Sequence, residues 1–262
     1  VSFMPYDGYL RPDFNTLDLF RKMLADNSSG LDTPAAVILE TIQAEGGINV
    51  ARPEWLKELA EICHQFDILM IIDDIQVGNG RSGDFFSFEE ADLKPDIVCL
   101  SKSIGGGLPM AFILMRPDLD QWRPGEHTGT FRGNNLAFVA STQALCYWDT
   151  NDFSEAVKYK GTVMERELKK IAETYPELEA SVRGRGMIYG LELPERGLAS
   201  QVSERCFENG LIIELAGSYD QVVKFLPALT IDEETLLRGI EIVGQSIGEI
   251  LKKKKENLTG EL

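Results

Sequence analysis

The amino-acid sequence predicts an α/β protein with a mainly parallel sheet in its first part and a smaller α+β unit after it. Two patterns predict this fold class. Over the first part of the chain, short runs that are apolar at nearly every position alternate with helical patterns. Such runs are typical of parallel strands buried on both faces and connected by helices. Beyond about residue 150, long amphipathic helices separate a few short strands, which is typical of an α+β arrangement.

In the first part, each helix shows one apolar face. Leu17 and Phe20 mark that face in the first helix, and Leu56 and Leu59 mark it in the second. The strands are runs such as Ile-Leu-Met-Ile-Ile, which carry no polar residue. The predicted elements, in order, are a helix over 16–26, a strand over 35–39, a helix over 53–66, and strands over 68–72, 97–100 and 111–115.

In the second part, the last helix is the most clearly amphipathic, because Leu236, Ile240 and Val243 recur at helical spacing. A helix is predicted over 134–148, at the end of the first part. The predicted helices of the second part cover 152–175, 198–208 and 232–253, and its predicted strands cover 187–193, 210–214 and 222–226. We place the domain boundary near Thr150. This gives a first domain over 1–150 and a small C-terminal domain over 151–262.

Composition excludes several classes of function. The chain has 262 residues and a net charge of −16, which argues against nucleic acid and anionic membranes as partners. Its apolar runs fall well short of the ~20 residues that a membrane span needs. Four cysteines without a CxxC pair are expected to be reduced thiols in a cytoplasmic protein. Two histidines cannot form a histidine-rich metal site, so we predict no metal.

Three chemically active side chains lie at or just past the ends of predicted strands. They are Glu40, Asp73 and Lys102. Ligands of parallel sheets bind beyond the carboxyl ends of the strands. Burial there would disfavour the charged form of the amine, and a neutral amine can form a Schiff base with a carbonyl. An amine and an acid at two strand ends are what pyridoxal phosphate requires. The alternatives are an exposed lysine, and a strand-end turn for Asp73 and Asp74.

The stretch from Gly78 to Gly83 fits the G-x-G-x-x-G pattern of dinucleotide-binding loops. That motif must open a helix whose N-terminus meets the pyrophosphate. Here an aromatic stretch follows, without helical spacing at its start, so we reject nucleotide binding. The three glycines at 105–107 are expected to let the backbone turn sharply beside the cofactor.

Four blocks carry a resemblance to a known family. They are ETIQAEGG (40–47), DDIQVGNGRSG (73–83), the block around Lys102, and GEHTGTFRGN (125–134). With them, the sequence resembles the class III, or ornithine-aminotransferase-like, branch of the fold type I pyridoxal-phosphate transferases. The resemblance implies a cytoplasmic enzyme that acts on small amino and 2-oxo acids as a homodimer or higher homo-oligomer. It also implies a further stretch before residue 1, carrying the phosphate loop and a ring-stacking aromatic.

The resemblance assigns a role to each matching residue. Lys102 would carry pyridoxal 5'-phosphate and move a proton at the substrate Cα. Asp73 would hold the ring nitrogen protonated. Gln76 would donate to the phenolic oxygen of the cofactor. Thr130 would reach across the oligomer to the cofactor phosphate of the neighbouring subunit.

The substrate site departs from the ornithine-enzyme pattern. The family uses a glutamate, matching Glu45, to mask an arginine, but the arginine position holds Lys224, which cannot grip a carboxylate bidentately. The resemblance favours a subgroup that converts glutamate and aspartate 4-semialdehyde into 2,4-diaminobutyrate and 2-oxoglutarate for ectoine biosynthesis. The alternatives are an ω-aminotransferase for ornithine, acetylornithine or 4-aminobutyrate, and an inactive fragment of the fold.

Overall fold

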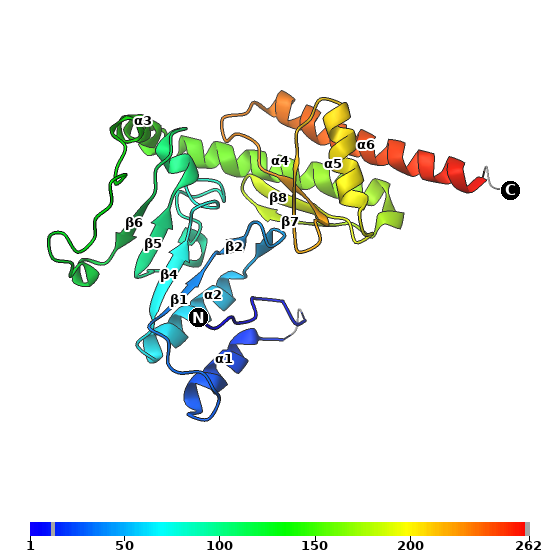
Figure 1. The fold of residues 1–262 in the computed structure, drawn as a ribbon. Helices are drawn as coiled ribbons and strands as arrows, with labels where there is room; N and C mark the ends of the chain where they lie inside the picture. Colours follow the sequence, from blue (N-terminus) through cyan, green and yellow to red (C-terminus); the bar gives the residue numbers. More distant parts are fainter. Residues whose placement is uncertain (12–13, 260–262) are drawn as a thin grey trace. The chain divides into compact units, whose positions relative to one another are not determined.

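The structure of the protein is a computed structural model that describes residues 1–11 and 14–259 (Figure 1). The chain divides into two compact units, and it passes between them more than once. The first unit consists of Val1–Ile42, Val50–Gly80 and Asp84–Phe153, and the second unit consists of Gln43–Asn49, Arg81–Gly83 and Ser154–Leu262. A short ladder of β2 (Ile42–Gln43) and β3 (Asn49–Val50) lies where the chain enters and leaves the first of the two inserted segments.

The first unit is built on a four-stranded sheet with the order β1-β4-β5-β6. The strands are β1 (Ala36–Leu39), β4 (Leu69–Asp73), β5 (Ile97–Leu100) and β6 (Phe112–Met115). The first three are parallel, and β6 runs antiparallel to β5. The predicted mainly parallel sheet is therefore confirmed.

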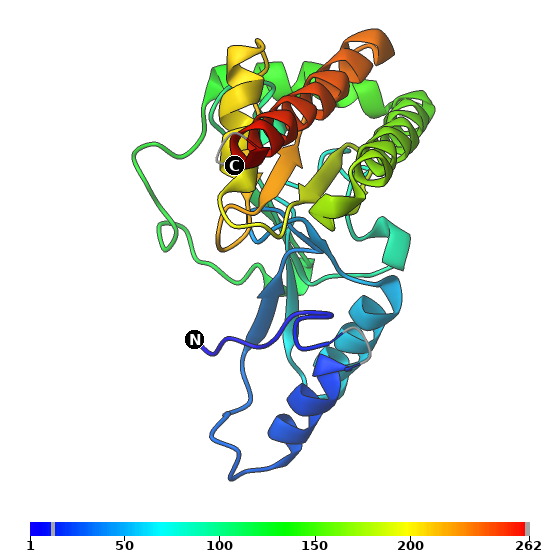
Figure 2. The same cartoon turned by 90° about the vertical axis from the view of Figure 1, so that its right-hand side faces the viewer.

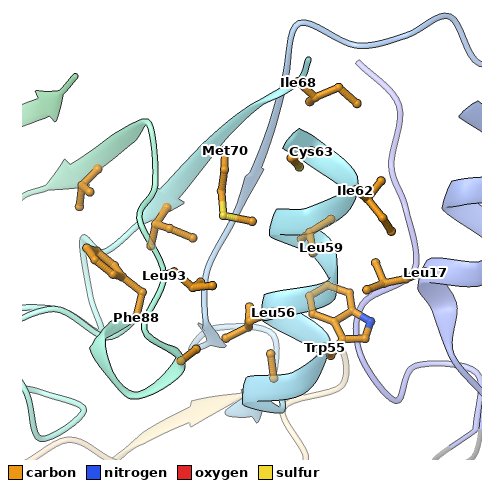
Figure 3. Packing of buried hydrophobic residues seen from close by; sticks show 14 of the residues in the cluster. Leu17, Trp55, Leu56, Leu59, Ile62, Cys63, Ile68, Met70, Phe88 and Leu93 are labelled. Atoms are coloured by element: carbon orange, nitrogen blue, oxygen red, sulfur yellow. The ribbon is translucent and has the colours of Figure 1, made fainter. Parts of the chain in front are cut away.

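Two helices pack on one face of this sheet, α1 (Thr16–Ala25) and α2 (Pro53–Gln65) (Figure 2). Asn15 caps α1 by accepting a hydrogen bond from the Leu17 amide, and the Trp55 indole of α2 donates to Thr16 Oγ1 at 2.9 Å. Figure 3 shows Leu56 of α2 on the side toward Leu93, and Trp55 and Ile62 on the side toward Leu17 of α1. The core is thus formed by alternate residues of each strand.

The opposite face of the sheet is open among the described residues. Ile38 of β1 is 61% exposed and Ile113 of β6 is 42% exposed. The sequence predicted helices on both faces, because the strands are apolar at every position. Among the described residues, α1 and α2 pack on one side of the sheet, and Ile38 and Ile113 on the other face stay exposed.

The second unit contains an antiparallel sheet with the order β7-β8-β10-β9. Its strands are β7 (Ser181–Arg185), β8 (Ile188–Glu192), β9 (Glu214–Ala216) and β10 (Val222–Phe225), and its helices are α4 (Asp152–Thr174), α5 (Leu198–Glu208) and α6 (Glu233–Thr259). The helix α3 (Asn135–Leu145) belongs to the first unit.

Most predicted elements are found within a few residues of their expected bounds, with four differences. The short strands β2 and β3 were not predicted, and the last helix runs to Thr259 instead of residue 253. The strand predicted over 210–214 begins only at Glu214, because Gly210 has φ of 85° and residues 211–213 form a connection. The strand β7 was not predicted, since its Ser-Val-Arg-Gly-Arg sequence is neither apolar nor alternating. None of the described helices is long and apolar enough to cross a membrane.

Candidate active site

Asp73 and Lys102 lie at the ends of two neighbouring parallel strands. Asp73 is the last residue of β4 and is paired with Cys99 of β5. Lys102 follows the end of β5 and begins a 3₁₀ turn over Lys102–Gly105. The adjacent strands therefore bring an acid and an amine to the same edge of the sheet, as the sequence predicted.

The backbone conformation of Lys102 indicates a functional residue, whereas its burial does not. Lys102 has φ of 51°, in the left-handed region that side chains with a Cβ rarely adopt. Such a conformation costs about 1–3 kcal/mol, and such strain is concentrated at functional sites. The predicted burial is wrong for the described chain, in which Lys102 is exposed. Its side chain lies at the carboxyl end of β5. The hydrophobic core packs on one face of the sheet and does not include it.

The glycines after Lys102 fix the turn against helix α3. Gly106 has φ of 61°, and a Cβ at this position would meet the backbone carbonyl carbon and oxygen of Ala140 at 2.8 Å. The sequence predicted a sharp turn here, and the structure adds a close contact between the turn and a helix. Only glycine satisfies both requirements, so α3 holds the turn that carries Lys102 in place.

Asp73 and Asp74 point to opposite faces, since successive residues of a strand alternate. Asp74 is fully buried, and its Oδ2 accepts a hydrogen bond from the Ser87 amide at 3.1 Å. Asp73 is half-buried on the open face, where its Oδ1 accepts from the Ile75 amide at 3.1 Å. Asp74 therefore stabilises the loop that follows β4, whereas Asp73 is placed to meet a ligand.

Cys99 lies opposite Asp73 in the register of the two strands. Burial raises the pKa of the Cys99 thiol above its ordinary value, and the negative charge of Asp73 raises it further. The thiol is therefore neutral at physiological pH, so it adds no charge beside Asp73. Gln76 follows in the same loop and is half-buried.

Thr130 lies in a long exposed connection between β6 and α3. Its neighbour Phe131 is 98% exposed, and Trp122 in the same connection is 51% exposed. Within the residues that the structure describes, Thr130 makes no hydrogen bond to Asp73 or Lys102. Thr130 therefore lies in an exposed connection that also carries exposed apolar side chains.

Glu45 and Lys224 are in direct contact within the second unit. Lys224 is on β10 and is 3% exposed, and its Nζ lies 2.8 Å from Glu45 Oε1. The same Nζ lies 2.8 Å from Oε2 of a second carboxylate, Glu214. Sequence reasoning missed Glu214, because the strand that carries it was predicted four residues too early.

Lys224 is a buried cation that two glutamates stabilise. Burial by itself would lower the pKa of Lys224, but the hydrogen bonds and charges of Glu214 and Glu45 outweigh it and raise the pKa above its ordinary value. The amine is therefore protonated throughout the physiological range. No group of three or more histidine, cysteine, aspartate or glutamate side chains is placed to hold a metal ion in the described ranges.

The Gly78–Gly83 loop has a structural role. It continues into turns, and among the described residues no α-helix begins there, which agrees with the rejection of a dinucleotide site. Within the second unit, the Arg81 guanidinium donates to the backbone oxygens of Met187 and Pro227 at 3.0 and 2.5 Å. Burial lowers the pKa of Arg81 to about 10, and these carbonyls stabilise its charge.

A family model for class-III aminotransferases matches residues 15–247 of the chain. A diaminobutyrate–2-oxoglutarate transaminase from Wolinella succinogenes is 57% identical over 98% of this chain and 60% of its own length. The enzyme of the same name from Bordetella parapertussis is 52% identical over 97% of this chain and 59% of its own length. The chain thus spans about 60% of the length of these curated relatives.

Solved structures of aminotransferases share the fold. An N-acetylornithine aminotransferase from Stenotrophomonas maltophilia superposes with a TM-score of 0.79 at 30% identity, over 92% of this chain and 62% of its own. An ornithine aminotransferase from Toxoplasma gondii gives a TM-score of 0.81 at 27% identity, over 92% of this chain and 56% of its own. The arrangement of strands and helices described above is therefore that of these proteins.

Proposed function

Because the chain belongs to the class-III aminotransferase family, we propose that the protein transfers amino groups between amino acids and 2-oxo acids with pyridoxal phosphate as cofactor. The observation that carries the proposal is the placement of Asp73 and Lys102 at the ends of two adjacent parallel strands, with Lys102 in a strained backbone conformation. We further propose that the first and second units correspond to the large domain and the small C-terminal domain of the family.

The residues present fit this cofactor. Pyridoxal phosphate, when bound, supplies an electron-withdrawing ring that stabilises negative charge at the substrate Cα. Asp73 offers a half-buried carboxylate that can hold a proton on the ring nitrogen, because its oxygens lie on the open face of the sheet. The exposed Lys102 Nζ can attach to the cofactor carbonyl, and after its release it can move the proton at Cα. The Gln76 amide can donate to the phenolic oxygen.

We propose that the reaction takes the amino group of L-glutamate to L-aspartate 4-semialdehyde, giving L-2,4-diaminobutyrate and 2-oxoglutarate, as a step toward ectoine. The curated relatives at 52–57% identity carry the name of that activity. Lys224 also stands where the ornithine enzymes use an arginine, which agrees with a substrate other than ornithine because lysine and arginine bind carboxylates differently. The solved structures named for ornithine and acetylornithine are less similar, at 27–30% identity.

The proposed substrate is tested by comparing amine donors with the full-length protein and 2-oxoglutarate as acceptor. We expect 2,4-diaminobutyrate to exceed ornithine and 4-aminobutyrate in kcat/KM by about tenfold or more, which corresponds to about 1.4 kcal/mol of transition-state binding. The readout is 2-oxoglutarate-dependent glutamate formation for each donor. Equal or better use of ornithine would refute the substrate while leaving the aminotransferase assignment in place.

We also propose that the active protein is a homo-oligomer in which Thr130 binds the cofactor phosphate of a neighbouring subunit. The exposed Phe131 next to Thr130 and the exposed Trp122 in the same connection support this, because apolar side chains on a surface favour association. Thr130→Ala is expected to weaken cofactor affinity about threefold to tenfold through loss of one charge-assisted hydrogen bond. Cofactor titration measures the affinity and light scattering the mass. A fully active monomer would contradict the proposal.

The net charge of −16 supports small-molecule substrates over nucleic acid or anionic membranes, and we propose a cytoplasmic location for the protein. Two of the four cysteines, Cys63 and Cys206, are buried and unpaired in the structure. Burial raises the pKa of Cys63 to about 11, so this thiol stays protonated and unreactive. Reduced, buried thiols of this kind are typical of a reducing compartment.

A further inference from the structure

We propose that Glu214 is a second specificity-determining residue of the substrate site, which shares Lys224 with Glu45 and sets the charge of the site. This inference rests on the aminotransferase function proposed above and concerns the part of the site that binds the substrate side chain. The family resemblance assigns one glutamate, Glu45, as the partner of residue 224. The structure places two carboxylates on a single buried ammonium, each at 2.8 Å.

The two glutamates reach Lys224 from independent parts of the second unit. Glu214 lies directly opposite Lys224 in the register of β9 and β10, so cross-strand pairing fixes its position. Glu45 comes from the Gln43–Asn49 segment, whose backbone oxygens accept hydrogen bonds from other parts of the second unit. The Gly217 amide donates to the backbone oxygen of Glu45 at 2.9 Å, and Arg183 Nε donates to that of Gly47 at 2.8 Å.

Room for this arrangement depends on a glycine on the other side of Lys224. Gly190 of β8 is the partner of Lys224 in the register of β8 and β10. A Cβ at this position would meet Val222 Cγ1 at 2.6 Å and Ile48 Cγ1 at 3.0 Å. Since Ile48 belongs to the segment that carries Glu45, Gly190 allows that segment to lie against the sheet beside Lys224.

The charges of the three residues determine which substrate the site favours. One ammonium and two carboxylates sum to −1, whereas Lys224 with Glu45 alone would be neutral. A net negative site favours the second ammonium group of a diamine. A substrate carboxylate in the same place would have to pair with Lys224, and to do so it must displace the glutamates that already pair with Lys224. Glu214 therefore makes the site more selective for the cationic substrate than a single glutamate would.

Burial shows which partner can move. The side chains of Glu45 and Glu214 are each 67% exposed, whereas that of Lys224 is 2% exposed. A carboxylate that turns away from Lys224 remains in contact with water, so its charge is not left buried. Lys224 has no such alternative, since moving without a partner would leave its charge buried. The ammonium of Lys224 thus stays in place, and a substrate carboxylate can replace either glutamate as its ion-pair partner.

The test is Glu214→Gln in the full-length protein, with Glu204→Gln, an exposed glutamate on α5, as the matched control. Glutamine keeps the size and hydrogen-bonding capacity and removes the charge. We expect the KM for 2,4-diaminobutyrate to rise and the KM for 2-oxoglutarate to fall, each about threefold to tenfold, with kcat little changed. Calorimetry with glutarate, an unreactive dicarboxylate, should show tighter binding to Glu214→Gln by a similar factor.

The opposite direction of the two KM changes separates this role from a structural one. Equal behaviour of Glu214→Gln and Glu204→Gln in both assays would overturn the inference, as would a rise of both KM values together. The glutarate affinities of Glu214→Gln and the unmutated protein test the role of Glu214 without requiring catalysis. An unmutated protein that binds glutarate but fails to transaminate would therefore refute the proposed function separately.

Discussion

Replacing Lys102 with alanine is expected to abolish transamination in the full-length protein, with a loss on the order of 10⁴-fold or more. The residue supplies the only group that we assign both to covalent attachment of the cofactor and to proton movement at the substrate Cα. Borohydride reduction followed by peptide mass spectrometry should find the cofactor on Lys102 of the unmutated protein. The alanine variant should have lost that adduct, together with its visible absorption.

Two further variants separate chemistry from folding. Lys94→Ala, at an exposed lysine in the connection before β5, should retain full activity. Lys102→Gly should be as inactive as the alanine variant but more stable than it by about 1 kcal/mol, because glycine adopts the φ of 51° without strain. A lysine–cofactor adduct that survives in Lys102→Ala would show that the anchoring lysine lies elsewhere.

Replacing each of the two neighbouring aspartates with asparagine should have different effects, a loss of activity at Asp73 and a loss of stability at Asp74. Asp73→Asn is expected to bind cofactor yet to lose about 10²- to 10⁴-fold in kcat, because a neutral amide does not hold the ring nitrogen protonated. Asp74→Asn should keep most of its kcat per folded molecule. Its free energy of unfolding should fall by about 1–3 kcal/mol, because the fully buried carboxylate accepts the Ser87 amide.

The measurements are kcat under saturating cofactor and the midpoint of chemical unfolding for both variants. The two residues serve as matched controls for each other, since they are adjacent and undergo the same chemical change. If Asp74→Asn showed the large loss in kcat and Asp73→Asn the loss of stability, the acid that meets the ring would be the one on the packed face of the sheet.

The sequence predicted the strand-end pair well for a physical reason. Each of β4 and β5 is an apolar run that stops at a polar residue, so the end of each strand could be read from composition alone. Parallel pairing then places Asp73 and Lys102 on one edge. The exposure of Lys102 could not be predicted, because it depends on which faces and edges other elements cover.

The contact of Glu214 with Lys224 could not be predicted from the sequence, for a different reason. Nothing in Gly-Leu-Ile-Ile-Glu-Leu-Ala shows where the strand begins, since the apolar residues extend across the connection and the strand alike. A register shift of one residue turns every side chain of a strand to its other face. The pairing of Lys224 with Glu214 therefore became visible only once the hydrogen bonds of β9 and β10 were known.

The Gln43–Asn49 segment has a consequence for the order in which the protein can fold. It belongs to the second unit, yet its Glu45 precedes the Lys224 it contacts by 179 residues. A chain leaves the ribosome N-terminal end first, at about 5–20 residues per second. The segment thus waits on the order of ten seconds or more for β10 to be made. The second unit is consequently completed only when β10 meets the Gln43–Asn49 segment, and a cut near residue 150 would separate that segment from the strand that carries Lys224.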